Sequence, residues 1–153
     1  MTAGNSSGLN DAASALVIMS REKAEQLGVQ PLAVIKAHAI AGVDPNIMGI
    51  GPVPATQKVL EKSGLSIDEM DIIEINEAFA AQVIACDREL KMDPNIVNVN
   101  GGAIAHGHPL GATGAILFTK AVYELKRIGG RRALITACIG GGQGIAAIIE
   151  KEE

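Results

Sequence analysis

Aromatic residues are nearly absent from this sequence, whose 153 residues include no Trp, one Tyr and two Phe. So few rings leave little to stack against bases, and the formal net charge of -4 comes without any basic tract. Nucleic-acid binding depends on cationic surfaces and, for single strands, on aromatic stacking platforms. We therefore expect no nucleic-acid partner.

Long apolar runs and cysteines are scarce as well. No apolar run approaches the roughly 18 residues that a membrane-spanning helix requires, so no membrane association is predicted. The first residues lack the charged and apolar regions of a secretory signal, and the two cysteines, Cys86 and Cys138, lie far apart. This pattern argues against a disulfide framework and favours a reducing, cytoplasmic compartment. No spaced set of metal ligands is present, so no metal site is predicted.

Small and aliphatic residues dominate instead, with 48% hydrophobic residues and 18 glycines. The length fits one domain of ordinary size. Apolar runs bounded by turn residues predict strands, which fall at residues 13–19, 32–40, 71–75, 96–99, 133–139 and 145–149. Helical periodicity and glycine or proline boundaries predict helices, which fall at residues 20–27, 52–62, 78–90 and 109–128.

This alternation, with two strands meeting across a glycine turn at the end, indicates an α/β fold. It predicts a helix-covered sheet that is mostly parallel, with one antiparallel strand beside the last pair. Open sheets of this kind place their sites at the C-terminal ends of strands. Three unusual segments fall at such ends, namely residues 76–77, residues 106–109, and Cys138 with its glycines.

His108 is the first candidate for chemistry. Pro109 follows it, and Gly111 and Gly114 lie in the next turns, so the ring is predicted at or just before a helix N-terminus. The positive end of a helix disfavours the imidazolium, and a neutral ring suits a base or a neutral hydrogen-bond donor. A histidine that merely caps the helix is the alternative, and the residues alone leave it open.

Cys138 is the second candidate, because it ends an apolar strand and precedes the glycines at 140–142. Glycines there free backbone N–H groups to hold an oxyanion, and a cysteine with a perturbed pKa can act as acid or base. The alternative is a small residue buried in a strand. A joint site with His108 is a spatial hypothesis that sequence spacing leaves open.

Asn76 is the third candidate, between a predicted strand and the helix that begins near Phe79. Its amide could cap that helix, or it could fix a water or a ligand carbonyl. Phe79 could belong to the core or line a pocket. These alternatives also stay open on the residues alone.

Five segments taken together resemble the thiolase family, and the resemblance runs over essentially the whole chain. TAGNSSGLND at residues 2–11 resembles the opening of the family's C-terminal domain, and GIGPVPA at 49–55 resembles its next landmark. NEAFA at 76–80, GHPLGATG at 107–114 and CIGGGQG at 138–144 resemble its three catalytic-loop motifs. Each segment alone is a weak signal, whereas all five in order are highly specific.

The resemblance implies that residues 1–153 form a thiolase C-terminal domain, a three-layer α/β/α half with a mixed five-stranded sheet. It implies acyl transfer between acetyl-CoA or a 3-ketoacyl-CoA and CoA, with CoA as substrate and no cofactor. His108 would activate a nucleophilic cysteine and donate to a thioester oxygen, while Asn76 would hold a water in that oxyanion hole. Cys138 would shuttle a proton at the acetyl methyl group, and the Gly140 amide would help form a second oxyanion hole.

The resemblance also implies substrate contacts. Ala78 and Phe79 would wall the acyl pocket, while Ala3 and Ser7 would contact the pantetheine of CoA. In the family the nucleophilic cysteine belongs to an N-terminal half, and Cys86 lies in the wrong motif to replace it. We therefore expect a separate N-terminal half or a homo-oligomeric partner, and no activity without the nucleophile.

Two departures and two further hypotheses accompany this resemblance. His106 stands where the family has an apolar residue, and Ala12 where glycine is common.

The chain could instead be a non-catalytic module that binds CoA or associates with itself. A ketoacyl-synthase-like half is a third hypothesis, and the Cys138 motif argues against it because those enzymes use two active-site histidines and no acid of the Cys138 type.

Overall fold

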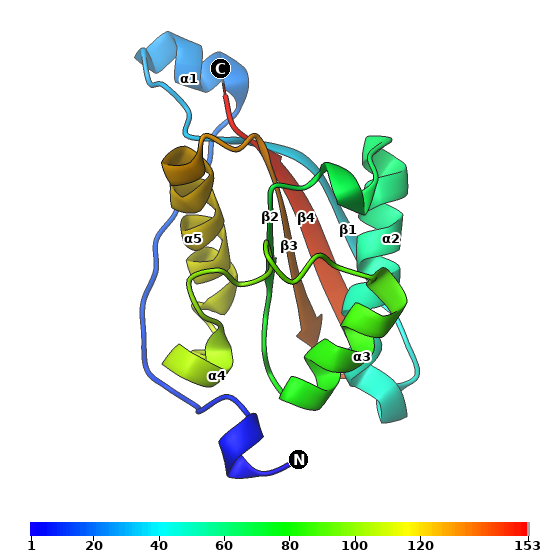
Figure 1. The fold of residues 1–153 in the computed structure, drawn as a ribbon. Helices are drawn as coiled ribbons and strands as arrows, with labels where there is room; N and C mark the ends of the chain where they lie inside the picture. Colours follow the sequence, from blue (N-terminus) through cyan, green and yellow to red (C-terminus); the bar gives the residue numbers. More distant parts are fainter. Residues whose placement is uncertain (153) are drawn as a thin grey trace.

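The computed structural model, which describes residues 1–152, has a sheet between two helical layers (Figure 1). The sheet consists of four strands: β1 (Val34–Gly42), β2 (Ile72–Ile75), β3 (Arg132–Ile139) and β4 (Gln143–Glu150). Their order is β1-β4-β3-β2. β4 runs antiparallel to both neighbours, whereas β3 and β2 are parallel. The sheet is mixed, because three strands run in one direction and β4 runs against them. The reversed strand belongs to the last pair instead of lying beside it as expected, and two of the three pairings are antiparallel.

Within residues 1–152, five α-helices and three short 3₁₀ helices accompany the sheet. The α-helices are α1 (Arg21–Leu27), α2 (Pro52–Ser63), α3 (Ala80–Leu90), α4 (Ala103–His106) and α5 (Thr113–Ile128). The 3₁₀ helices are η1 (Ala3–Asn5), η2 (Pro45–Ile50) and η3 (Ile67–Glu69). α2 and α3 cover one face of the sheet and α5 covers the other (Figure 1). Among residues 1–152, no helix has the length and apolar character needed to cross a bilayer.

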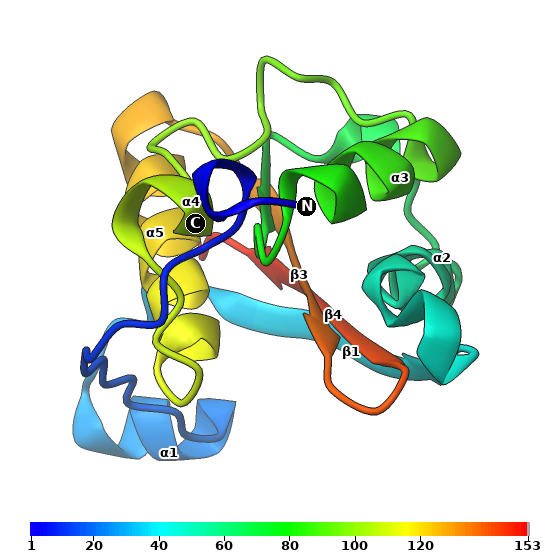
Figure 2. The ribbon, with the colours of Figure 1, turned by 90° about the horizontal axis from the view of Figure 1, so that it is seen from below.

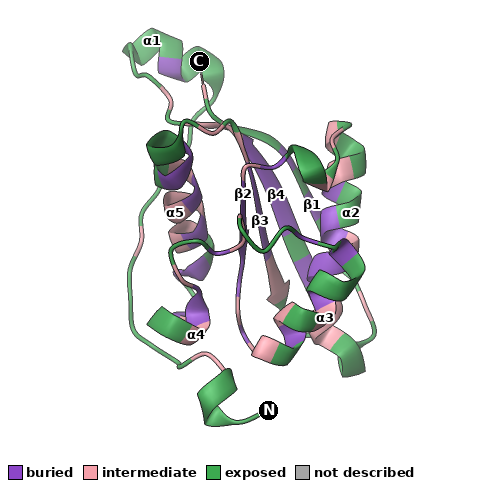
Figure 3. Cartoon of the chain, viewed as in Figure 1, coloured by how far each residue is buried: buried purple, intermediate pink, exposed green. Residues whose placement is uncertain are grey.

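Aliphatic side chains fill the core on both faces of the sheet. Figure 3 shows the buried residues concentrated on the strands and on the helices that cover them. On the α2 and α3 face, Ile75, Leu134 and Ile148 are fully buried. On the other face, α5 presents Leu117 and Leu125, which lie two turns apart on one stripe of the helix. This two-sided burial explains why the central strands read as continuous apolar runs rather than as alternating ones.

The parallel pair β2–β3 determines where the candidate residues meet. Ile75 lies opposite Thr136, and the Asn76 N–H donates to the Thr136 carbonyl at 2.9 Å. Both strands therefore end at the same edge of the sheet, and Cys138 follows two residues after Thr136. The expectation that residues 76–77 and Cys138 lie at strand C-terminal ends is confirmed. The same expectation for residues 106–109 is wrong, because these residues follow the single-turn helix at residues 103–106 and not a strand.

The expected five-stranded sheet is wrong, because the segment at residues 96–99 forms only an isolated bridge between Ile73 and Val97. Asn98 has a left-handed backbone, with φ of 45°, which interrupts an extended ladder. Its side chain makes the next two bonds instead. Asn98 Oδ1 accepts from the Ile75 N–H at 3.0 Å, and Asn98 Nδ2 donates to the Ile75 carbonyl at 2.9 Å.

The predicted strand at residues 13–19 is also wrong. This segment runs irregularly along the outside of α5, and its apolar side chains are exposed, with Val17 at 87% and Ile18 at 70% (Figure 1). A strand forms only where a neighbouring edge offers backbone partners. On the edge strand β1, the carbonyls of His38 and Ile40 accept instead from lysines of α2.

The two faces of this sheet suggest a paired test of the core. We expect Ile148→Ala to lower the free energy of unfolding by about 2–5 kcal/mol, because Ile148 is 0% exposed and its loss leaves a cavity. Ile40→Ala makes the same chemical change at a side chain that is 50% exposed, and should cost less than about 1 kcal/mol. Urea denaturation of the two variants measures the difference, and equal losses would contradict this description of the core.

Candidate active site

Three side chains meet where β2 ends and α5 begins. Asn76 Nδ2 lies 3.3 Å from His108 Nε2, and His108 Nδ1 lies 2.6 Å from the Thr113 hydroxyl. The Thr113 hydroxyl also donates to the Pro109 carbonyl at 3.0 Å. Asn76 is 1% exposed, so the amide that faces the histidine is held by the surrounding structure rather than by solvent.

These contacts assign the two nitrogens of the His108 ring. The one proton of the Thr113 hydroxyl goes to the Pro109 carbonyl, so the hydroxyl accepts from Nδ1–H. The Asn76 amide nitrogen can only donate, so Nε2 presents its lone pair to it. Both contacts favour the same neutral tautomer, in which Nε2 is the position free to accept a proton.

Burial acts on the same ring. It lowers the pKa of His108 below its ordinary value, because desolvation disfavours the charged imidazolium. His108 lies five residues before Thr113, the first residue of α5, and Ala112 is the N-cap, so the histidine does not cap this helix. A neutral ring with an open lone pair can therefore serve as a general base near neutral pH.

The N-terminal segment ties the candidate loops together. The Ser7 N–H donates to the Ala78 carbonyl at 3.0 Å, and the Gly8 carbonyl accepts from the His108 N–H at 2.8 Å. Gly107 has φ of 93°, and a Cβ there would overlap the Asn10 side chain, so only glycine fits before His108. Figure 2 shows this segment passing between α4 and the start of α3.

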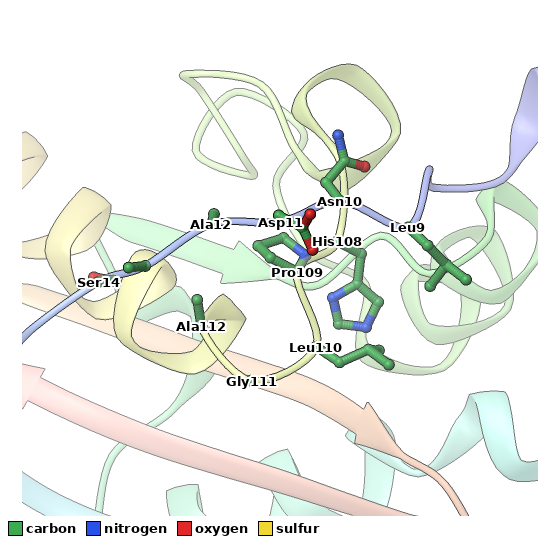
Figure 4. A pocket seen from close by; sticks show the side chains of 11 residues that line it. Leu9, Asn10, Asp11, Ala12, Ser14, His108, Pro109, Leu110, Gly111 and Ala112 are labelled. Carbon is green, nitrogen blue, oxygen red and sulfur yellow. The ribbon is translucent and has the colours of Figure 1, made fainter.

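An open cleft of about 690 Å³ lies beside His108. Two segments line it, residues 9–14 and residues 108–112. Figure 4 shows the imidazole between the side chains of Leu9 and Leu110, with Asn10 turned away from it. The ring is therefore reachable from outside the chain, while its Nδ1 side faces Thr113 and α5.

Cys138 lies at the same sheet edge but on the other face. In β3 the Cys138 side chain points to the same face of the sheet as those of Leu134 and Thr136. Leu134 packs in the core beneath α2 and α3, so Cys138 lies on that face. Burial raises the pKa of the Cys138 thiol, so the protonated form dominates. Within residues 1–152 no hydrogen bond joins this thiol to His108 or Asn76, whose contacts are with each other and with Thr113.

Gly140 stands at the tip of the turn between β3 and β4. It is exposed, and among residues 1–152 its N–H donates no hydrogen bond to the backbone. Gly141 and Gly142 have φ near 82°, a conformation that other residues rarely adopt. The turn therefore holds a free N–H next to Cys138, which an anionic oxygen could accept.

The four predicted substrate-contact residues divide into two pairs. Ala78 is 9% exposed and Phe79 is half-buried, and both adjoin Asn76 at the start of α3. Ala3 is exposed in η1, and Ser7 adjoins Ser6, which pairs with Phe79 through an isolated bridge. Their contacts with an acyl chain or with pantetheine remain predictions. No group of three or more metal-binding side chains occurs in the part of the chain that is described.

Thr113 is a functional residue that the sequence analysis missed. Its position five residues after His108, in the first turn of the following helix, was the available signal. Helical geometry directs a first-turn hydroxyl back toward the preceding loop, where the carbonyl of Pro109 and the ring of His108 both lie.

Comparison with known proteins adds to this geometry. Residues 29–151 match the family model described as "Thiolase, C-terminal domain". The chain belongs to the thiolase family. The match includes β1 to β4 and the segments with Asn76, His108 and Cys138, so the resemblance read from five motifs is confirmed.

Individual thiolases are closely similar to this chain. A beta-ketothiolase, BktB, of Cupriavidus necator is 58% identical over 151 residues, and an acetyl-CoA acetyltransferase of Syntrophomonas wolfei is 54% identical over 154. The alignments cover 99% and 98% of this chain but only 38% of each relative. The chain thus spans well under half the length of the curated relatives it matches.

Solved thiolase structures have the same fold. The Bacillus anthracis acetyl-CoA acetyltransferase superposes with a TM-score of 0.97 at 52% identity, covering 99% of this chain and 38% of that one. Human mitochondrial 3-ketoacyl-CoA thiolase in complex with CoA gives 0.93 at 48% identity, covering 99% and 39%. The four-stranded α/β structure described above is therefore the C-terminal part of a thiolase fold.

The contact between Thr113 and His108 predicts a spectroscopic change. In Thr113→Val the Nδ1–H loses its acceptor, so we expect the imidazole to shift toward the tautomer protonated at Nε2, as ¹⁵N NMR of the ring would report. Thr119→Val is the matched control, because the Thr119 hydroxyl donates to the Ala115 carbonyl at 2.8 Å in the same helix. An unchanged tautomer in Thr113→Val would refute the assignment.

Proposed function

We propose that this chain supplies the proton-transfer half of an acyl-CoA acyltransferase site. The reaction is transfer between acetyl-CoA or a 3-ketoacyl-CoA and CoA, by Claisen condensation or by thiolysis. One observation favours it most: the Nδ1–H of His108 is fixed by Thr113 at 2.6 Å, which leaves the Nε2 lone pair beside the Asn76 amide. The relatives named above support the choice of acyl-CoA as substrate class.

His108 is the base for the acylation step in this proposal. Its Nε2 takes the S–H proton of a nucleophilic cysteine, the thiolate attacks the thioester carbonyl, and the CoA sulfur leaves with that proton. Once protonated, Nε2 also donates to a thioester oxygen, and Asn76 holds a water for the same oxyanion hole. The Asn76 amide lies 3.3 Å from His108 Nε2, which supports its place beside that hole.

Cys138 is the acid and base for the carbon centre. In condensation only the deprotonated thiolate, which is the minor form of Cys138 because burial raises its pKa, can take a proton from the acetyl methyl group, and the resulting enolate attacks the acyl-cysteine, whose sulfur leaves as a thiolate. In thiolysis the protonated thiol returns a proton to the enolate carbon. The Gly140 N–H would stabilise the oxyanion of the acyl-cysteine, because it is exposed and makes no backbone hydrogen bond.

The nucleophilic cysteine must come from outside the residues described. Burial and desolvation raise the pKa of Cys86 to about 11, so its thiol stays protonated. Cys86 also donates to the Gly49 carbonyl at 3.4 Å within the core. We therefore propose that an N-terminal thiolase half provides the nucleophile, and that the enzyme acts in the cytoplasm, a reducing compartment that keeps thiols free.

A chimera with the N-terminal part of the Cupriavidus relative tests this function. We expect cleavage of acetoacetyl-CoA by CoA in the chimera and no cleavage by the 153-residue chain alone. Cys138→Ala and His108→Ala should each lower the rate by about 100-fold or more, because general acid–base groups contribute that much. Cys86→Ala is the control for losing a thiol and should retain the rate. A folded chimera without activity would contradict the proposal.

The low pKa of His108 predicts a pH dependence. The ring must be neutral to accept a proton, so kcat/KM should fall as the pH drops through its pKa. Because burial lowers that pKa, the acid limb of the profile should lie below about 6.5, the ordinary imidazole value. The profile of the chimera measures this limb, and a midpoint at or above about 6.5 would count against His108 as a buried base.

A further inference from the structure

The carboxylate of Glu77 joins two segments that meet at the candidate site. Its Oε1 accepts from Asn98 Nδ2 at 2.9 Å, and its Oε2 accepts from the Ile104 N–H at 3.1 Å. Asn98 lies in the loop before α4, and Ile104 lies in the first turn of α4. Glu77 itself directly follows Asn76, so the carboxylate belongs to the same short segment as the amide that faces His108.

Asn98 anchors this carboxylate to the sheet. Its side chain exchanges two hydrogen bonds with the backbone of Ile75, at 3.0 and 2.9 Å. Glu77 is thus fixed to the end of β2 twice, through the chain and through Asn98. A charged acceptor that receives two N–H groups forms the stronger class of hydrogen bonds, so this connection is stiff.

Gly102 shows how closely the loop is fitted around the carboxylate. Its backbone is extended, with φ of -120° and ψ of -169°, which any residue can adopt. A Cβ added at Gly102 would nevertheless overlap the carboxyl group of Glu77. The glycine leaves the space that the carboxylate occupies, and a side chain at this position would displace the carboxylate.

α4 connects this anchor to the catalytic histidine. It is a single turn whose C-cap Gly107 donates its N–H to the Ala103 carbonyl at 2.8 Å, and His108 follows directly. On the other side of the loop, Lys120 donates to the Gly101 carbonyl at 2.5 Å and to the buried carboxylate of Glu74 at 2.7 Å. The start of α4 is therefore held by these hydrogen bonds, and His108 lies two residues after its last residue, His106.

We propose that Glu77 is a positioning residue that sets the distance between Asn76 and His108. It fixes the start of α4 relative to the end of β2, and so holds Nε2 at 3.3 Å from the Asn76 amide. The effect of Glu77 on the distance between Asn76 and His108 does not depend on any activity, whereas its effect on catalysis rests on the function proposed above. Glu77 does not touch the reacting atoms, and it acts only through the two residues that do.

Glu77→Gln tests the proposal without changing the size of the side chain. Both partners of the carboxylate are donors, so a glutamine keeps one acceptor and turns its NH₂ group against the other donor. Glu69→Gln is the matched control. Glu69 also accepts a backbone N–H, that of Ser66 at 2.9 Å, but it precedes β2 at the opposite end from the site.

The first readout is ¹⁵N NMR of the 153-residue chain. In Glu77→Gln we expect the Nε2 resonance of His108 and the side-chain amide of Asn76 to shift, while the Nδ1–H bond to Thr113 persists. Glu69→Gln should leave both resonances in place. If Glu77→Gln leaves them unchanged, or if both variants shift them equally, the proposal is overturned. Because this readout needs no substrate, it is independent of the proposed function.

Gly102→Ala is a second route to the same displacement, since its methyl group must push the carboxylate aside. It should shift the same two resonances, and it should do so less in a Glu77→Ala background, where the methyl meets no carboxyl group. Equal shifts in both backgrounds would overturn the proposal.

In the chimera, Glu77→Gln should lower kcat by about 10- to 100-fold with little change in the KM for CoA. A normal kcat in an active chimera would overturn the catalytic consequence, whereas an inactive unmodified chimera would overturn the proposed function alone.

Discussion

The parallel pairing of β2 with β3 is the constraint on which the candidate site depends. Buried aliphatic residues on both faces hold these strands together, and the bond from the Asn76 N–H to the Thr136 carbonyl closes the pair at its C-terminal end. Asn76 and Cys138 therefore leave the sheet at one edge, although they lie 62 positions apart in sequence. Helix-covered parallel strands produce such an edge because side chains and loops gather where the strands stop.

Around this edge, polar side chains replace backbone pairing that the chain itself does not provide. Asn98 continues the hydrogen bonding of β2 where the fifth strand is reduced to one bridge. Thr113 fixes the ring of His108, and Glu77 fixes the turn that leads to it. Each of these side chains satisfies a buried or half-buried polar group that would otherwise be costly to leave unpaired. The geometry of the proposed proton transfers follows from these secondary contacts.

Several elements could be predicted from sequence because their signals are local. The apolar stripes of α3 and α5 and the glycines that end α1, α2 and α5 determine those helices within a few residues. The wrong predictions share a cause. Residues 13–19 and 96–99 have the apolar composition of strands, but strand formation also requires a partner edge, which composition does not reveal. The Thr113 contact was missed because it depends on the orientation of the first turn of α5 relative to the loop that contains His108.

The sequence by itself determined the family, the helices and the identity of the candidate residues, because motifs and helical periodicity depend only on residues close together in the chain. Only the tertiary structure decided which residues touch. It joined Asn76 to His108, gave His108 a defined tautomer, and left Cys138 on the opposite face of the sheet. It also showed that Glu77 accepts hydrogen bonds from Asn98 and from the first turn of α4. Distances between segments depend on packing and strand pairing, which no local pattern specifies.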